Sequence, residues 1–284
     1  MAALPPITAE LRKQIARIER ASTTTGFDAK PIFPNPDQGE SRKGEIVISA
    51  GAAKIDAALP WGGLPANGLH EIFGDATATG FAASLLARLE TVRSGAPILW
   101  CQTGRELYGP GIAAYGLDPN RLILVHGRND TDLLWAMEEG LAAPGIAGVV
   151  GVLHKVPPIA GRRLQLAAEE RGRFGLLLRP LDPLARTRAA ADLAATSMAL
   201  TRWRVGALPS EPMLIGGREA GMGPERWRIE LQRCRLSTFN QNSTYAGHPK
   251  TWQVEWRDET GDLTVVAALR DGSAEPAERW RTAS

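Results

Sequence analysis

Residues 68–86 read GLHEIFGDATATGFAASLL, and this stretch decides the fold. Leu69 to Phe73 form an apolar run that predicts a short buried strand, and small residues bounded by Gly74 and Gly80 predict a loop. The residues that follow predict an amphipathic helix that ends at about Arg93. A strand, a glycine-bounded loop and a helix in this order are the outline of a phosphate-binding loop.

The chemistry of a nucleotide-binding loop is missing from this outline. Such a loop has two glycines separated by four residues, followed by lysine and then serine or threonine. Here the glycines are one residue too far apart, Phe81 occupies the lysine position and Ala82 the hydroxyl position. We therefore expect no ATP cofactor and treat Gly74, Thr79, Gly80, Phe81 and Ala82 as a degenerate phosphate loop. Weak anion binding at the helix N-terminus stays open, because free N–H groups and a partial positive charge remain there.

Composition is that of an ordinary globular protein, with 44% hydrophobic and 23% charged residues in a chain of 284. No apolar run approaches the roughly 18 residues of a membrane span, and the N-terminus lacks the apolar core of a signal peptide. We expect a cytoplasmic α/β protein with no membrane partner. Cys101, Cys234 and four scattered histidines show neither a disulfide framework nor metal-ligand spacing, so we expect no metal and two buried cysteines.

The N-terminal segment is set apart by its composition. Residues 7–20 read ITAELRKQIARIER and predict a helix with Leu11, Ile15 and Ile18 on one side and a basic opposite face. A proline-containing linker follows, so residues 1–43 form an arm of helix and linker. The arm can dock on a neighbouring subunit, on a different protein or on its own domain.

Strands and helices alternate along the middle of the chain, which predicts a parallel sheet with right-handed crossovers. The pattern changes after Ser197, where strands follow one another and predict an antiparallel extension. We expect a core over residues 44–205, an extension over 206–270 and a flexible tail over 271–284. The predicted strands cover 45–49, 69–73, 97–101, 122–126, 148–153, 174–178, 198–205, 226–236, 251–256 and 263–269, and the later helices cover 129–142, 161–171 and 183–195.

Residues 48–59 (ISAGAAKIDAAL) and 62–74 (GGLPANGLHEIFG) resemble the opening of the RecA ATPase core. The resemblance covers about residues 45–205 and implies a RecA-like sheet flanked by helices. Where that family carries an acidic base, a magnesium-supporting aspartate and a nucleotide-sensing glutamine, this chain reads CQTG at 101–104, GVL at 151–153 and LRP at 178–180. Glu106 lies further along than the expected base. These departures imply a core that does not hydrolyse ATP.

The degenerate loop, the N-terminal LRKQIARIE and the late strand RWRIEL at 226–231 are together similar to the ImuA family of bacterial accessory proteins in damage-induced mutagenesis. This resemblance implies a non-catalytic scaffold of an error-prone translesion DNA synthesis complex in the SOS response. The implied partners are an ImuB-like inactive Y-family polymerase protein and, through it, a C-family DNA polymerase and the sliding clamp. RecA and single-stranded DNA are further candidate partners.

Two later strands carry Arg-Trp-Arg, at 202–204 and 226–228. Alternation along a strand sends each tryptophan to one face and its arginines to the other. The arginine face could bind phosphate or a partner, which makes Arg202, Arg204, Arg226, Trp227 and Arg228 candidate surface residues. Buried tryptophans with solvated arginines are the structural alternative. Two functional alternatives also remain, a single-stranded DNA or RecA-filament binding regulator and a RecA-like ATPase completed by a neighbouring subunit.

Overall fold

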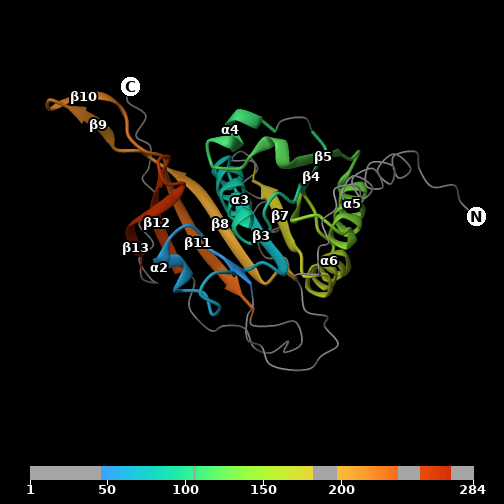
Figure 1. Ribbon diagram of the computed structural model, residues 1–284. Helices are drawn as coiled ribbons and strands as arrows, with labels where there is room; N and C mark the ends of the chain where they lie inside the picture. The colour runs from blue at the N-terminus through green and yellow to red at the C-terminus, as the bar shows by residue number, and fades with distance from the viewer. Residues whose placement is uncertain (1–45, 105–106, 182–196, 236–249, 270–284) are drawn as a thin grey trace, which may run out of the picture.

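The computed structural model describes residues 46–104, 107–181, 197–235 and 250–269 (Figure 1). One sheet of nine strands organises these residues, in the order β13-β12-β11-β8-β3-β7-β6-β4-β5. Its strands are β3 (Gly68–Gly74), β4 (Ile98–Gln102), β5 (Leu122–His126), β6 (Gly148–Val152), β7 (Phe174–Pro180), β8 (Thr201–Leu208), β11 (Arg226–Cys234), β12 (Lys250–Arg257) and β13 (Asp262–Leu269).

The sheet is parallel from β8 to β5 and antiparallel from β8 to β13. β3 lies between β7 and β8, with parallel neighbours on both sides. Every residue of β3 is buried, as expected for a central strand covered on both faces. The predicted α/β class, a mostly parallel RecA-like sheet with an antiparallel extension, is confirmed.

The main helices are α3 (Thr77–Ala87), α4 (Gly109–Ala113), α5 (Asp130–Ala142) and α6 (Pro158–Glu170). They lie on opposite faces of the sheet, with α3 on one side and α5 and α6 on the other (Figure 1). Neighbouring residues of β7 show this division: Leu176 and Leu178 belong to the same buried cluster as Phe81 of α3, while Leu177 belongs to the cluster that contains Met137 of α5. The sheet therefore has two apolar cores, one on each face.

Four tryptophans of the antiparallel strands lie on the same face as α3 and are buried. The rings of Trp227 and Trp256 stack with centroids 5.8 Å apart, and those of Trp203 and Trp252 lie 6.4 Å apart. Trp252 and Trp256, four residues apart on β12, also lie on this face, and both belong to the core. The packed tryptophan rings of the antiparallel strands therefore belong to the same apolar core as α3.

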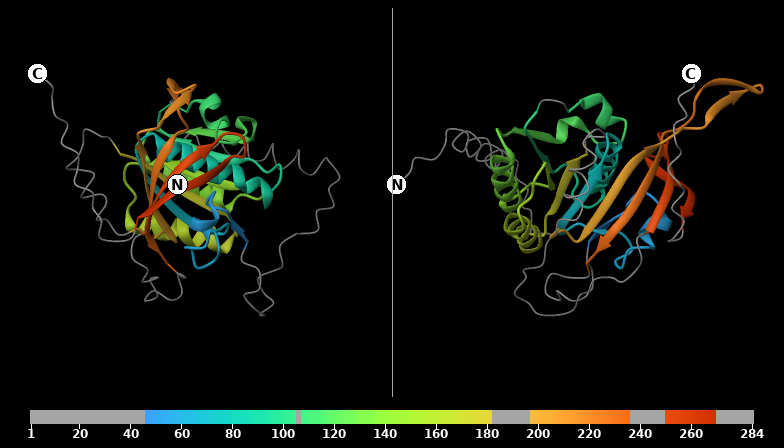
Figure 2. Two further views of the ribbon diagram at one scale, coloured as in Figure 1. Left: turned by 90° about the vertical axis from the view of Figure 1, so that its left-hand side faces the viewer. Right: turned by 180° about the vertical axis from the view of Figure 1, so that it is seen from behind.

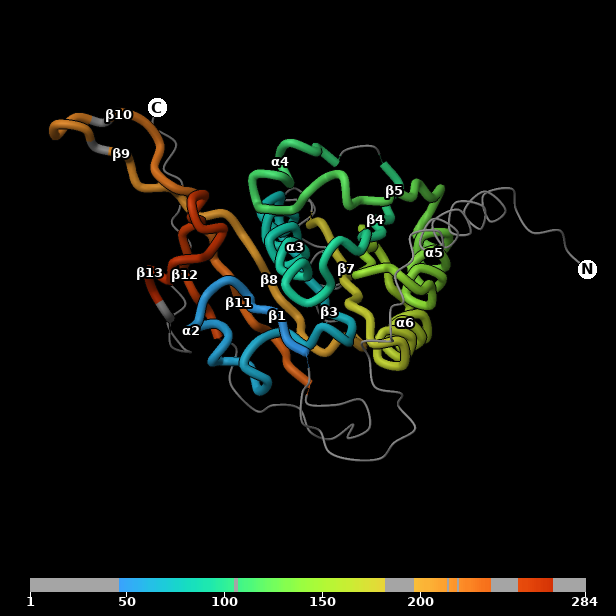
Figure 3. Tube along the Cα trace, viewed as in Figure 1, coloured from blue at the N-terminus to red at the C-terminus, as the bar shows by residue number. Residues whose placement is uncertain are grey.

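The first described residues pack beside the last ones. Strands β1 (Val47–Ile48) and β2 (Leu64–Pro65) form a small separate sheet, with α2 (Ala53–Asp56) between them in sequence. The tube in Figure 3 shows α2 next to β12 and β13, and the Leu263 N–H donates to the Gly51 carbonyl at 2.8 Å. The strand predicted at 45–49 is therefore shorter than expected and joins β2 instead of the main sheet.

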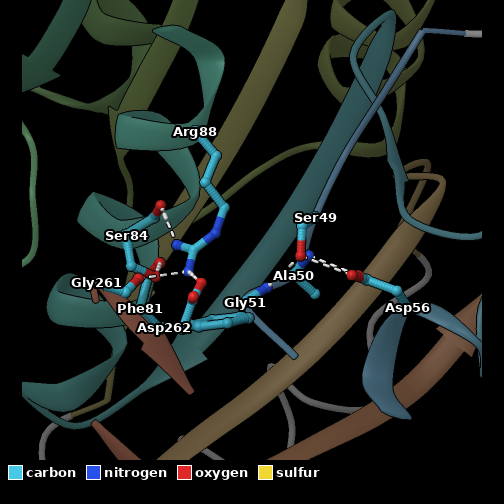
Figure 4. Close-up of polar contacts among 9 residues, drawn as sticks. All are labelled: Ser49, Ala50, Gly51, Asp56, Phe81, Ser84, Arg88, Gly261 and Asp262. Carbon is cyan, nitrogen blue, oxygen red and sulfur yellow. Dashed lines mark hydrogen bonds and ion pairs between the residues drawn. The ribbon is translucent and has the colours of Figure 1, made fainter. Parts of the chain in front are cut away.

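Arg88, just after α3, fixes this junction (Figure 4). Its guanidinium donates to the Ser84 carbonyl and the Gly261 carbonyl, each at 2.6 Å, and lies 3.1 Å from the Asp262 carboxylate. On the neighbouring segment, the Asp56 carboxylate accepts from the Ala50 N–H and the Ser49 hydroxyl, each at 2.6 Å. These contacts tie the end of α3 to the turn between β12 and β13.

A hairpin that the sequence pattern did not predict projects from the sheet between β8 and β11 (Figures 1 and 2). It consists of β9 (Pro212–Ile215) and β10 (Arg218–Met222), joined by Gly216 and Gly217 with φ angles of 60° and 79°. Two consecutive positive φ angles are those of a tight hairpin turn, which explains the glycine pair.

Two predicted elements lie outside the described residues, the helices at 7–20 and 183–195, as does the tail at 271–284. The helix predicted at 161–171 begins earlier, at Pro158, because proline suits the first turn of a helix. Within the described ranges, no helix is long and apolar enough to cross a membrane. Cys101 and Cys234 are buried free thiols, as predicted.

Candidate functional site

The turn between β3 and α3 consists of only Asp75 and Ala76. The helix begins at Thr77, so Thr79, Gly80, Phe81 and Ala82 are helical. The predicted loop up to Gly80 is therefore wrong: the segment that would wrap around phosphate in a nucleotide-binding loop is the first turn of α3. Residues 77–80 have no extended backbone with which to cradle a phosphate.

The Asp75 carboxylate occupies the N-terminal end of α3. Its Oδ1 accepts from the Thr77 N–H at 2.9 Å and from the Thr77 hydroxyl at 2.5 Å. Its Oδ2 accepts from the Ala207 N–H of β8 at 2.9 Å. A helix N-terminus attracts negative charge, and here the chain supplies that charge itself. A phosphate brought to this end of the helix would meet a carboxylate.

Both glycines of the degenerate loop have packing reasons. A Cβ on Gly74 would lie 1.8 Å from the backbone oxygen of Val205, so only glycine allows β3 and β8 to approach here. A Cβ on Gly80 would lie 2.7 Å from Cζ of Tyr115, whose ring covers the helix at that point. These positions serve close packing of backbone and ring.

Phe81 points into the core, away from any phosphate position. It is fully buried, and its ring meets that of Trp203 edge to face with centroids 6.0 Å apart. Ala82, in the position of the magnesium-binding hydroxyl, is also fully buried. The face of α3 that carries Phe81 and Ala82 is thus part of the core that contains the tryptophans.

The positions at which RecA-like proteins carry the acidic base and the magnesium-supporting aspartate hold residues with structural contacts in this chain. Gln102 accepts from the Trp100 indole N–H at 2.9 Å and donates to the Gly104 carbonyl at 2.8 Å. A Cβ on Gly151 would lie 2.1 Å from Sδ of Met137, so α5 packs directly on β6. Leu153 is buried, and Glu106 lies outside the described residues.

Glu71, in the middle of β3, holds two arginines at the carboxyl end of the sheet. Its carboxylate lies 3.1 Å from Arg179 and 3.3 Å from Arg202, and all three side chains are largely buried. The Arg202 guanidinium also lies 5.1 Å from the centre of the Phe73 ring. Arg202 therefore belongs to a buried ion cluster, and it does not extend the predicted basic surface.

The remaining surface candidates divide between core and solvent. Trp227 is fully buried, so the structural alternative of buried tryptophans holds for it as for Trp203. Arg226 lies 2.8 Å from Glu211 and 3.5 Å from Glu255, and Arg204 lies 3.9 Å from Glu230.

Arg204 and Arg228 are exposed on the face opposite the tryptophans. That face is mixed in charge, because glutamates accompany its arginines. Leu11, Ile15 and Ile18 lie outside the described residues.

A groove of about 480 Å³ lies beside the N-terminal half of α3 and was not predicted. It is bounded by the start of α3, by α4 and its flanks, and by residues next to β11 and β12. The lining residues are Ala76, Thr79, Gly80, Leu107, Tyr108, Gly111, Ile112, Ala114, Tyr115, Glu225, Trp256 and Asp258. Sequence reasoning missed it because these residues are separated by up to 182 positions, and only Ala76, Thr79 and Gly80 lie in a recognised motif, the degenerate phosphate loop.

Tyr115 connects the floor of the groove with its acidic rim. Its ring packs on Trp227 and Trp256 at 5.6 and 5.3 Å between centroids, and its hydroxyl donates to Oε2 of Glu225 at 2.7 Å. The Trp227 indole N–H donates to the same oxygen at 3.3 Å. Burial, followed by the hydrogen bond to Glu225 and then by the charges of Glu225 and Asp258, raises the pKa of the Tyr115 phenol. The phenol therefore stays a neutral donor to Glu225.

Comparison with curated proteins identifies relatives over most of the chain. The chain is 34% identical over 245 residues to a protein named Protein ImuA in two strains of Caulobacter vibrioides. Each match covers 83% of this chain and 95% of the relative. No family model matches the chain.

Proposed function

The chain belongs to the ImuA family, and we propose that it is a non-catalytic, RecA-like accessory protein of an error-prone translesion DNA synthesis complex in the bacterial DNA-damage response. Its role is to bind proteins: an ImuB-like inactive Y-family polymerase relative, through it a C-family polymerase and the sliding clamp, and RecA as a further candidate. The parallel sheet supplies a rigid base for these contacts, in the cytoplasm.

The observation that carries this proposal is the occupied end of α3. Asp75 uses the N–H group of Thr77 that a phosphate would need, and its charge repels one. The adjacent lysine position is filled by Phe81, which is buried against Trp203. Without a cationic group or a free helix end, Mg²⁺-ATP has neither of its usual points of attachment here.

The test is calorimetric titration of the full chain with Mg²⁺-ATP at millimolar concentration, with phosphate release followed in the same sample. We expect neither saturable heat nor turnover. Saturable binding would contradict the proposal and favour a nucleotide switch. Turnover that starts only when RecA is added would favour an ATPase completed by a neighbouring subunit.

A second candidate function, binding of single-stranded DNA, is favoured by Arg204 and Arg228, which are exposed on the same face of the sheet. Phosphate contacts of this kind weaken steeply with salt. If DNA binding is the function, affinity for an oligonucleotide falls with rising salt and drops further in Arg228→Ala. The nearby carboxylates of Glu230 and Glu255 weigh against this candidate, because both arginines share their face with them.

A further inference from the structure

The groove beside α3 combines an aromatic and apolar lining with an open mouth. Leu107, Ile112 and Trp256 supply apolar surface, and Tyr108 stands at the mouth with 70% of its surface exposed. A volume of about 480 Å³ is in the range of sites that enclose a small ligand or a few side chains. The lining is too polar for a purely apolar ligand, because two carboxylates belong to it.

The charge of the groove has one sign. Glu225 and Asp258 are its ionisable acidic residues, both are exposed, and none of the described lining residues is basic. Within the described part of the chain, neither carboxylate forms an ion pair, and Glu225 receives only the neutral donors Tyr115 and Trp227. A carboxylate has acceptor sites for more than two donors, so Glu225 has room for a cationic one.

Phosphate ligands are excluded from this groove by the same charges. Glu225 and Asp258 line the groove, so a nucleotide or a nucleic acid backbone bound there would meet two carboxylates. A guanidinium or ammonium group would be attracted here. The carboxylates lie at the rim, and the lining includes the aromatic rings of Tyr108, Tyr115 and Trp256, a type of ring whose face attracts cations.

We propose that the groove beside α3 binds an arginine or lysine side chain, flanked by apolar residues, on a segment of a partner protein. This inference rests on the proposed protein-binding function and specifies the chemistry of one partner contact. Charge complementarity selects the basic residue, and the apolar lining selects its neighbours.

The probe is the capped peptide acetyl-Leu-Arg-Leu-amide, titrated into the full chain and followed by nuclear magnetic resonance. Acetyl-Leu-citrulline-Leu-amide has nearly the same shape without the charge and serves as the matched ligand. The test variant combines Glu225→Gln and Asp258→Asn, which keep shape and hydrogen-bonding capacity. Glu259→Gln is the control, because Glu259 is exposed in the same turn and does not line the groove.

We expect saturable shifts of groove residues with the arginine peptide, at least tenfold weaker binding in the double variant, and no change in Glu259→Gln. Equal binding of the citrulline peptide, or undiminished binding in the double variant, would overturn the inference. Absence of any shift with the arginine peptide would also overturn it while leaving the proposed function standing. Mg²⁺-ATP is titrated in parallel, and saturation of the same residues by ATP would instead contradict the proposed function.

Discussion

The Asp75 carboxylate accepts two hydrogen bonds from Thr77, with Oδ1 2.9 Å from the backbone nitrogen and 2.5 Å from Oγ1. This contact starts α3 two residues after β3 and brings a fixed negative charge to the helix end. The N–H group of Thr77, which a phosphate site would leave free, is therefore hydrogen-bonded within the turn.

Removing the Asp75 carboxylate weakens the fold. In Asp75→Ala the Thr77 and Ala207 N–H groups lose their acceptor, and we expect the free energy of unfolding to fall by about 1–2 kcal/mol. Urea denaturation measures the change. Asp75→Asn retains an acceptor oxygen and should lose less. An unchanged midpoint in Asp75→Ala would show that the carboxylate does not stabilise the turn.

Restoring the lysine of a phosphate loop does not restore ATP chemistry. In Phe81→Lys an ammonium group is buried against Trp203, and we expect a loss of about 3 kcal/mol or more, with no ATP binding. Phe81→Leu is the control, with a loss of about 1–2 kcal/mol because it stays apolar. A stable Phe81→Lys variant that binds Mg²⁺-ATP would refute this account of the helix.

Acid destabilises the protein through His70. Its Nε2–H donates to the Pro65 carbonyl at 2.9 Å, and its Nδ1 accepts from the Thr201 hydroxyl at 2.7 Å, so the buried ring is neutral. Burial, partly opposed by the hydrogen bond to Pro65, lowers the pKa of His70 from 6.5 to about 4. Between pH 6.5 and pH 4 the His70 side chain binds a proton in the unfolded chain but not in the folded one. The stability that neutral His70 contributes is therefore fully present above pH 6.5 and is lost as the pH falls to 4.

The expected loss between pH 7 and pH 5 is about 2 kcal/mol from this residue. Guanidinium denaturation at both pH values, in the unmodified chain and in His70→Gln, isolates the contribution. A pH dependence that is the same in both proteins would mean that another group is responsible.

Deleting residues 1–43 tests the N-terminal arm. All residues removed lie before the first described strand, so we expect the remaining chain to stay folded and to bind the ImuB-like partner more weakly. Circular dichroism checks the fold and a binding titration checks affinity. The triple variant Leu11→Ser, Ile15→Ser, Ile18→Ser keeps the chain length and should weaken binding to a similar degree. Unchanged affinity in both proteins would assign partner binding to the sheet domain.

Most of the sheet was predictable, because its strands are buried apolar runs separated by helices of clear period. β5 and α5 agree with the predicted ranges, and Asn129 caps α5 through the Asp132 N–H. The start of α3 was not predictable from the glycine pattern. Gly74 and Gly80 imitate a phosphate loop, whereas each is required by a neighbour distant in sequence, Val205 and Tyr115.

The groove could not be predicted from sequence periodicity, because its lining residues come from segments far apart in the chain. Its acidic rim comes from Glu225 before β11 and Asp258 after β12, which approach each other only when the antiparallel strands pair. Arg202 is a second case, since strand alternation predicts its face but not its pairing with Glu71 on β3. Long-range pairing decided both sites, and no local pattern encodes it.

The most direct test of the account is the affinity of the full chain for the ImuB-like partner, measured by titration with and without millimolar Mg²⁺-ATP. We predict the same dissociation constant in both conditions, because Asp75 and Phe81 leave ATP no place to act. A change of tenfold or more on adding Mg²⁺-ATP would contradict the account and show that this protein is a nucleotide-controlled switch.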